Sequence, residues 1–165
     1  MDLSRYHALQ AKVDAKFQEI RARRPEDFAC RKGCHSCCVP GITVFAVEQA
    51  AIQSFFDTHP ERLEAAKRIQ RDNPHGGERC AFLEADGGCV IYEARPLVCR
   101  SHGAPLGTEF ALDVCPLNFT DVPLETLPTP DVIRLETLNT LLALVNRDTC
   151  PGDEARYPLR CDSFT

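Results

Sequence analysis

Hydrophobic residues recur at helical spacing in four segments of the chain. In residues 2–24 apolar side chains return at steps of three or four, and shorter amphipathic stretches cover residues 46–57 and 60–72. A further apolar stripe runs through residues 130–147. A period near 3.6 residues is typical of helices that cover a core with one face. The sequence therefore predicts four helices, the third of them rich in Arg and Glu on its outer face.

The segments between these helices lack a helical period. Residues 42–45 are expected to be extended, and short strands are expected at 81–83 and 90–92, joined by a hairpin turn at Asp86-Gly87-Gly88. The remaining segments share turn-forming Pro, Gly and Asn and are expected to be loops: residues 73–77, 99–106, 116–130 and the tail after Cys150. The prediction is a small single domain over residues 1–165, mainly α-helical, with irregular metal-stapled loops and a short β-hairpin.

The composition is that of a globular protein with one outlier, cysteine. Charged residues make up 26% of the chain and the net charge is −5, which argues against binding nucleic acid by neutralising phosphates. No apolar run approaches the roughly 20 residues that cross a bilayer, and the first residues lack the pattern of a secretory signal. We therefore expect a cytoplasmic protein with no nucleic-acid or membrane partner.

The ten cysteines favour metal binding over disulfides. Four of them fall between Cys30 and Cys38, and Cys37 and Cys38 are adjacent. So tight a cluster leaves few relaxed disulfide geometries, and disulfides are rare in the cytosol. A metal gathers several thiolates around one point, at about 2.3 Å for zinc. Gly33 favours such a loop because glycine readily adopts a positive φ. Five disulfides remain the alternative.

Several motifs together carry a family resemblance. Cys30-x3-Cys34-x2-Cys37-Cys38 is followed by Cys80-Ala-Phe-Leu, by Gly88-Cys89-Val-Ile-Tyr92-Glu-Ala-Arg95-Pro96-Leu-Val-Cys99-Arg100, and by Cys115. This pattern resembles the CxxCxxCC (YkgJ-like) family of zinc- or iron-chelating cysteine-cluster domains, whose relatives include flagellin lysine N-methylases. Cys30 and Cys34 stand one residue further apart than the family name implies. The resemblance implies a metal-binding core over residues 30–115 with eight candidate ligands: Cys30, Cys34, Cys37, Cys38, Cys80, Cys89, Cys99 and Cys115.

The residues around these cysteines suit a thiolate centre. Eight thiolates make two tetrahedral sites, or one site and an iron–sulfur cluster, and all-sulfur ligation selects zinc or iron. Arg95, Arg100 and Tyr92 are expected to contact the sulfur ligands or the cofactor. We interpret His35 and His102 as loop residues rather than ligands. The spacing of Cys30, Cys34 and Cys37 also occurs in radical S-adenosylmethionine enzymes, but the chain lacks their repeated strand–helix alternation.

Two finer expectations concern individual cysteines. Cys37 and Cys38 are neighbours, and neighbouring side chains point in different directions unless a tight turn intervenes. One is therefore expected to join the first loop and the other a centre built from the downstream cysteines. Cys150 and Cys161 lie outside the family pattern, and we favour a disulfide or an accessory metal site over unbridged thiols.

Three classes of function remain open from the sequence. The first is a metalloprotein in which zinc, iron or an iron–sulfur cluster has a largely structural or accessory role. The second is a metal- or iron–sulfur-dependent enzyme for redox chemistry or for modifying a protein or peptide substrate, as the methylase relatives imply. The third is a protein that stores or handles metal ions. A closed set of four ligands favours the first class, and an open coordination position beside a pocket favours the second.

Overall fold

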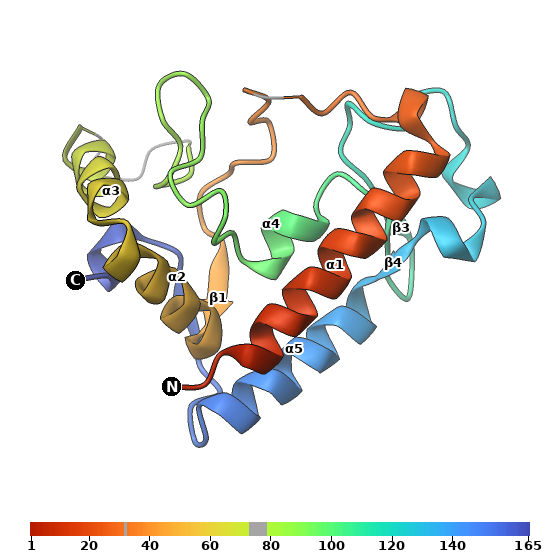
Figure 1. Cartoon of the computed structure of the whole chain (residues 1–165). Helices are drawn as coiled ribbons and strands as arrows, with labels where there is room; N and C mark the ends of the chain where they lie inside the picture. The colour runs from red at the N-terminus through yellow and green to blue at the C-terminus, as the bar shows by residue number, and fades with distance from the viewer. Residues whose placement is uncertain (32, 73–78) are drawn as a thin grey trace. The chain divides into compact units, whose positions relative to one another are not determined.

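The structure is a computed structural model that describes residues 1–31, 33–72 and 79–165 (Figure 1). Its described α-helices are α1 (Ser4–Arg23), α2 (Ala46–Thr58), α3 (Pro60–Asp72), α4 (Leu97–Ser101) and α5 (Leu135–Thr149). The strands are β1 (Thr43–Phe45), β2 (Leu106–Gly107), β3 (Leu112–Asp113), β4 (Ile133–Arg134) and β5 (Arg156–Pro158). The predicted mainly α-helical fold with short β pairs is confirmed.

One expected turn cannot be compared with the structure. The turn expected over residues 73–77 lies outside the described residues. Within the described ranges, no helix combines the length and the apolar character needed to cross a membrane.

The contacts group the chain into two compact units: unit 1 comprises Met1, Lys32–Pro96 and Asn146–Thr165, and unit 2 comprises Asp2–Arg31 and Leu97–Val145.

In unit 1 the strand that follows the first cysteine loop pairs with a strand near the end of the chain. Strand β1 pairs antiparallel with β5, with Thr43 opposite Pro158 and Phe45 opposite Arg156. Helices α2 and α3 pack against each other, and the core gathers Phe56, Phe82 and Phe164 with aliphatic side chains. The segment of β5 was expected to be part of a turn-like tail, and this prediction is wrong. Three residues that end in proline carry too little alternation to reveal a strand that pairing with β1 creates.

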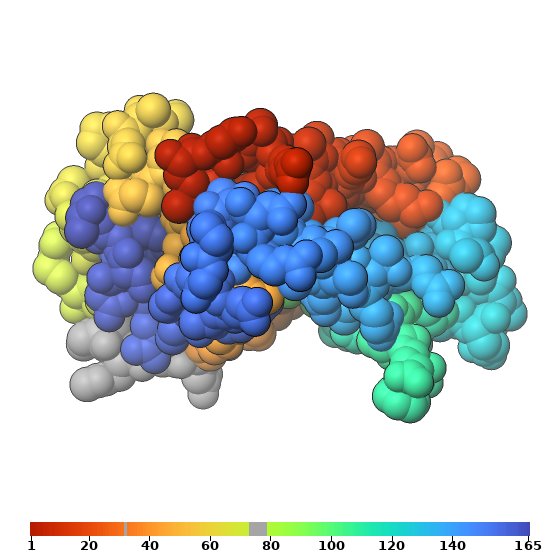
Figure 2. Space-filling view, turned by 90° about the horizontal axis from the view of Figure 1, so that it is seen from below, coloured from red at the N-terminus to blue at the C-terminus, as the bar shows by residue number. Residues whose placement is uncertain are grey.

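Unit 2 is built around α1, whose buried residues Tyr6, Leu9, Val13 and Ile20 follow the predicted period. Helix α4 packs against α1, and α5 runs antiparallel beside α1 (Figures 1 and 2). Strand β2 pairs antiparallel with β3 and parallel with β4. The loop between β2 and β3 protrudes from this unit in Figure 2.

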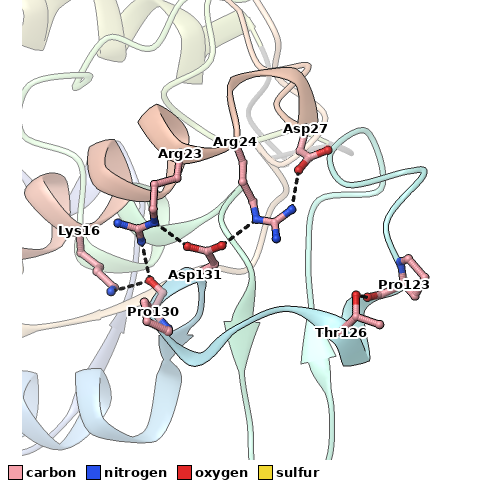
Figure 3. Close-up of polar contacts among 8 residues, drawn as sticks. All are labelled: Lys16, Arg23, Arg24, Asp27, Pro123, Thr126, Pro130 and Asp131. Carbon is pink, nitrogen blue, oxygen red and sulfur yellow. Dashed lines mark hydrogen bonds and ion pairs between the residues drawn. The ribbon is translucent and has the colours of Figure 1, made fainter.

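Two predictions about helices in unit 2 are corrected by tertiary contacts. Cys99 was expected to open a loop, but it lies in α4, which is held to α1 by an ion pair of 2.6 Å between Arg100 and Asp14. The last helix was expected from residue 130 but begins at Leu135. The residues before it are held elsewhere. Asp131 bonds Arg23, the last residue of α1, and Arg24, which follows it (Figure 3). Ile133 donates its N–H to Pro105 O.

Candidate metal centre

The first cysteine loop of unit 1 lies against the turn at residues 84–88. Gly33 has the predicted positive φ, at +85°, and Gly87 has a φ of +84°. A Cβ on Gly87 would stand 2.7 Å from Gly33 O and 3.1 Å from His35 Nδ1. Only a glycine therefore allows the two backbones to approach this closely. A hydrogen bond of 3.0 Å from Cys80 N to Cys38 O joins the same two segments.

This contact brings four thiols into one neighbourhood. Cys37 and Cys38 hydrogen-bond to each other through their side chains, so the turn at residues 36–37 brings these neighbours together. That hydrogen bond, burial and the charges of Cys37, Cys80 and Cys89 raise the pKa of Cys38 strongly. The charges of Cys80 and Cys89 act on Cys38, and Cys37 bonds Cys38 through the kind of tight turn that the expectation allowed for. The division of the ligands between centres stays a prediction.

Backbone N–H groups point at two of these sulfurs. The N–H of Phe82 donates to the Cys80 sulfur, and the N–H of Ile91 donates to the Cys89 sulfur. Burial raises the pKa of Cys80 and takes that of Cys89 to about 11, while these N–H bonds act in the opposite direction. Donors fixed at i+2 stabilise a thiolate once a cation has displaced its proton.

The strands expected at residues 81–83 and 90–92 do not form. The structure has only an isolated antiparallel bridge between Leu83 and Cys89 there, flanked by turns. The hairpin turn itself is present, with Glu84 N donating to Gly88 O at 2.8 Å. The N–H of Phe82 is directed at the Cys80 sulfur, so it is not available to extend this bridge into a β-ladder.

Three further candidate ligands belong to unit 2. Cys30 follows the 3-10 helix Pro25–Asp27, Cys99 lies in α4, and Cys115 is buried shortly after β3. Asn118 links two of them, because its Nδ2 lies 3.3 Å from Cys30 Sγ and its backbone N donates to Cys115 O at 2.8 Å. Asn118 was not predicted to belong to this site, because nothing in the sequence distinguishes this asparagine from others in turns.

The other candidate residues make contacts of their own. Cys34 Sγ lies 3.9 Å from Ser36 Oγ, and His102 forms a bridge with Ala104. Cys150 Sγ lies 3.8 Å from Met1 Sδ, whereas Cys161 is buried in the hydrophobic core of unit 1. Both are thiols in the structure, so no disulfide joins this pair there, and the accessory metal site stays a prediction.

Arg95, one of the three residues expected beside the sulfurs, interacts with a candidate ligand. Its charge acts on Cys89, and its guanidinium stacks 3.7 Å above the ring of Tyr92 while Nε donates to Tyr92 O. Tyr92 itself is exposed. Arg100 pairs with Asp14 of α1 in unit 2. The structure therefore associates Arg95 and Tyr92 with the thiols of unit 1, and Arg100 with α1.

The donor set of unit 1 fits zinc or iron by its chemistry. Sulfur donors select these metals over magnesium or calcium, and four of them fill a tetrahedral site. As the side chains stand, no three His, Cys, Asp or Glu residues of the described ranges form a ready-made metal site. The thiols of Cys37, Cys38, Cys80 and Cys89 act on one another electrostatically, and a cation would have to draw them closer together.

Comparison with known proteins points to the same chemistry. The family model CxxCxxCC, described as a "putative zinc- or iron-chelating domain", matches residues 29–116, more than half of the chain. The match begins just before Cys30 and ends just after Cys115, so it contains all eight candidate ligands. No curated protein and no solved structure matches the chain.

Proposed function

The chain belongs to the CxxCxxCC family, and on that premise we propose that it is a metalloprotein whose clustered thiolates bind zinc or iron at a structural centre. One observation carries the proposal: Cys37, Cys80 and Cys89 all act electrostatically on the Cys38 thiol, although the chain separates Cys38 from Cys80 by about forty residues. A metal at this position would tie the first cysteine loop to the segment of residues 80–89.

The four residues have distinct parts in this proposal. Cys37 and Cys38 provide two sulfurs from one turn, and Cys80 and Cys89 provide two sulfurs to which backbone N–H groups already donate. Arg95 offsets part of the negative charge that four thiolates bring to a divalent ion. Four sulfur ligands fill the tetrahedral positions of zinc, which favours a structural role over an open catalytic site. The proposal also assigns the protein to a reducing compartment such as the cytoplasm, where thiols persist.

Metal analysis of variants tests the proposal. Protein purified without oxygen should contain zinc or iron, and Cys89→Ser should lose about one metal ion, the share of four thiolates. Cys150→Ser is the control, because Cys150 is a thiol of unit 1 that lies outside the family match and contacts Met1. Metal content is measured by atomic emission, and the absorption spectrum separates colourless zinc from an iron–sulfur cluster.

Two results would contradict the proposed function. One is wild-type protein that neither contains zinc or iron nor takes them up after reduction. The other is a Cys150→Ser variant that loses as much metal as Cys89→Ser, since the loss would then follow from any cysteine replacement.

A further inference from the structure

Asn118 occupies a buried position between three segments of unit 2. Its side chain is 2% exposed, and it meets the residue pair Ala29–Cys30, the chain leaving α4 at Gly103 and the turn that follows Cys115. A buried amide at such a junction must satisfy each of its polar atoms with a partner. Its partners therefore show what the residue does.

The main-chain partners fix the orientation of the amide. Ala29 N can only donate, and it lies 2.9 Å from Oδ1. Gly103 O can only accept, and it lies 2.7 Å from Nδ2. One hydrogen of Nδ2 is therefore used by Gly103, and exchanging the oxygen and nitrogen would break both bonds.

The second hydrogen of Nδ2 is left for the Cys30 sulfur, which lies 3.3 Å away. The reverse contact, from Cys30 Sγ to Oδ1, is longer at 3.6 Å. A metal-bound thiolate has no proton to donate but keeps lone pairs that accept N–H bonds. The arrangement at Asn118 therefore suits a Cys30 sulfur that serves as a ligand.

The backbone at Gly103 supports the same position. Its φ is +103°, and a Cβ there would stand 3.5 Å from Cys30 Sγ and 3.4 Å from Asn118 Nδ2. The chain leaving α4 thus passes directly beside the sulfur. This close approach limits the directions in which the Cys30 side chain can turn.

We propose that Asn118 is a positioning residue for Cys30, which donates a hydrogen bond to the sulfur and holds it beside the chain leaving α4 and the turn after Cys115. The inference goes beyond the proposed function, whose four thiols do not include Cys30, and takes Cys30 as a ligand candidate because it lies within the family match. It extends that function to a residue beyond the end of the family match at residue 116. It also gives the cysteines of unit 2 a shared organising side chain.

The chain offers a matched control for this role in Asn146. This residue is also buried, its Oδ1 accepts from Val47 N at 3.0 Å, and its Nδ2 donates to Asp153 O at 2.6 Å. Asn118→Asp and Asn146→Asp each keep the acceptor and replace the donor by oxygen. Both variants lose a bond to a main-chain carbonyl, but only Asn118→Asp loses a bond to sulfur.

The decisive test is a double-mutant cycle in which each Asp variant is combined with Cys30→Ala and unfolded in urea. For Asn118 we expect non-additivity of about fivefold in the unfolding equilibrium constant, the size of one hydrogen bond. For Asn146 the effects should add within about twofold. Additive effects for Asn118 and Cys30 would overturn the inference.

Mapping of alkylated cysteines on zinc-loaded protein separates this inference from the proposed function. In Asn118→Asp, Cys30 should become accessible to iodoacetamide while Cys89 stays protected, and in Asn146→Asp both should stay protected. If Asn118→Asp does not fold, Asn118→Gln, which displaces the amide by one methylene, is measured instead. Cys30 protected equally in wild type and variant would overturn the inference. Unprotected Cys89 in wild type would overturn the proposed function, and the cycle would still decide the role of Asn118.

Discussion

At the scale of single residues, Asp131 is a buried carboxylate of unit 2 that binds two arginines. Its carboxylate accepts bonds of 2.8 Å from Arg23 Nε and 2.7 Å from Arg24 Nε, and its side chain is 5% exposed (Figure 3). Lys16 and Arg23 also donate to the carbonyl of the preceding Pro130. Three basic side chains thus fix the segment in front of β4 and α5 to α1 and the residue that follows it.

Replacing this carboxylate should make stability depend less on pH. Burial works against ionisation, but the hydrogen bonds from Arg24 and Arg23 prevail and lower the pKa of Asp131 below 3.8. The stabilisation is therefore present above about pH 4 and is lost as pH falls through the lower, folded pKa. We expect Asp131→Asn to reduce the free energy of unfolding by about 1–3 kcal/mol at pH 7. Urea unfolding from pH 7 to about pH 3 should show this deficit shrinking.

The control for Asp131→Asn is Glu125→Gln, at an exposed acidic residue of the same unit. It should change the free energy of unfolding by no more than about 0.5 kcal/mol. A deficit in Asp131→Asn that stays constant with pH would show that lost packing, rather than charge, explains the destabilisation.

At the scale of elements, the turn at residues 84–88 depends on the absence of a side chain at Gly87. Gly87 and Gly152 have the same φ of +84°. A Cβ added at Gly87 would stand 2.7 Å from Gly33 O, whereas a Cβ added at Gly152 would have no neighbour within 4 Å. Alanine in this conformation costs about 1–2 kcal/mol at either position. The difference between the two variants therefore isolates the contact between the turn and the cysteine loop.

We expect Gly87→Ala to lower the free energy of unfolding by at least about 1 kcal/mol more than Gly152→Ala, because overpacking adds to backbone strain. It should also weaken zinc binding, since the loop that carries Cys37 and Cys38 must move away. Urea unfolding and competition with a zinc indicator measure the two effects. Equal losses in both variants would mean that the loop tolerates the displacement.

The elements that the sequence predicted well are those set by local pattern. Helices α1, α2 and α3 lie within about two residues of their expected bounds, because their apolar period, or a proline at the first turn, is local information. The start of α5, helix α4 and strand β5 depend on remote partners instead. Ile133 N bonds Pro105 O, Arg100 pairs with Asp14, and Leu159 N bonds Ile42 O. No local pattern reveals such contacts.

The candidate site divides in the same way. The resemblance to the family implied eight candidate ligands, and Gly33 correctly predicted a positive φ. The meeting of Cys38 with Cys80 and Cys89 was expected, but the contact of Cys37 with Cys38 depends on a tight turn. The role of Asn118 arises from three segments that meet only in the fold, so its sequence neighbours give no signal.

At the scale of the whole molecule, removal of the metal should lower thermal stability sharply. A structural metal contributes several kcal/mol, and each kcal/mol shifts the midpoint by about 2–4 °C in a chain of this size. We expect a strong chelator with a reductant to lower the midpoint by at least about 10 °C, measured by circular dichroism. The control is the same chelator already saturated with zinc. An unchanged midpoint and full helical signal would rule out a structural role for the metal.

The pairing of β1 with β5 has a consequence for the nascent chain. Thr43 and Arg156, which hydrogen-bond across this pair, are 113 residues apart in sequence. At a synthesis rate of about 5–20 residues per second, roughly ten seconds separate the two strands on the ribosome. During that interval the thiols that precede β1 have been translated while the strand that completes unit 1 has not. Newly made chains therefore pass through a period in which these sulfurs exist before unit 1 is complete, and in which they are more open to oxidants and to the wrong metal.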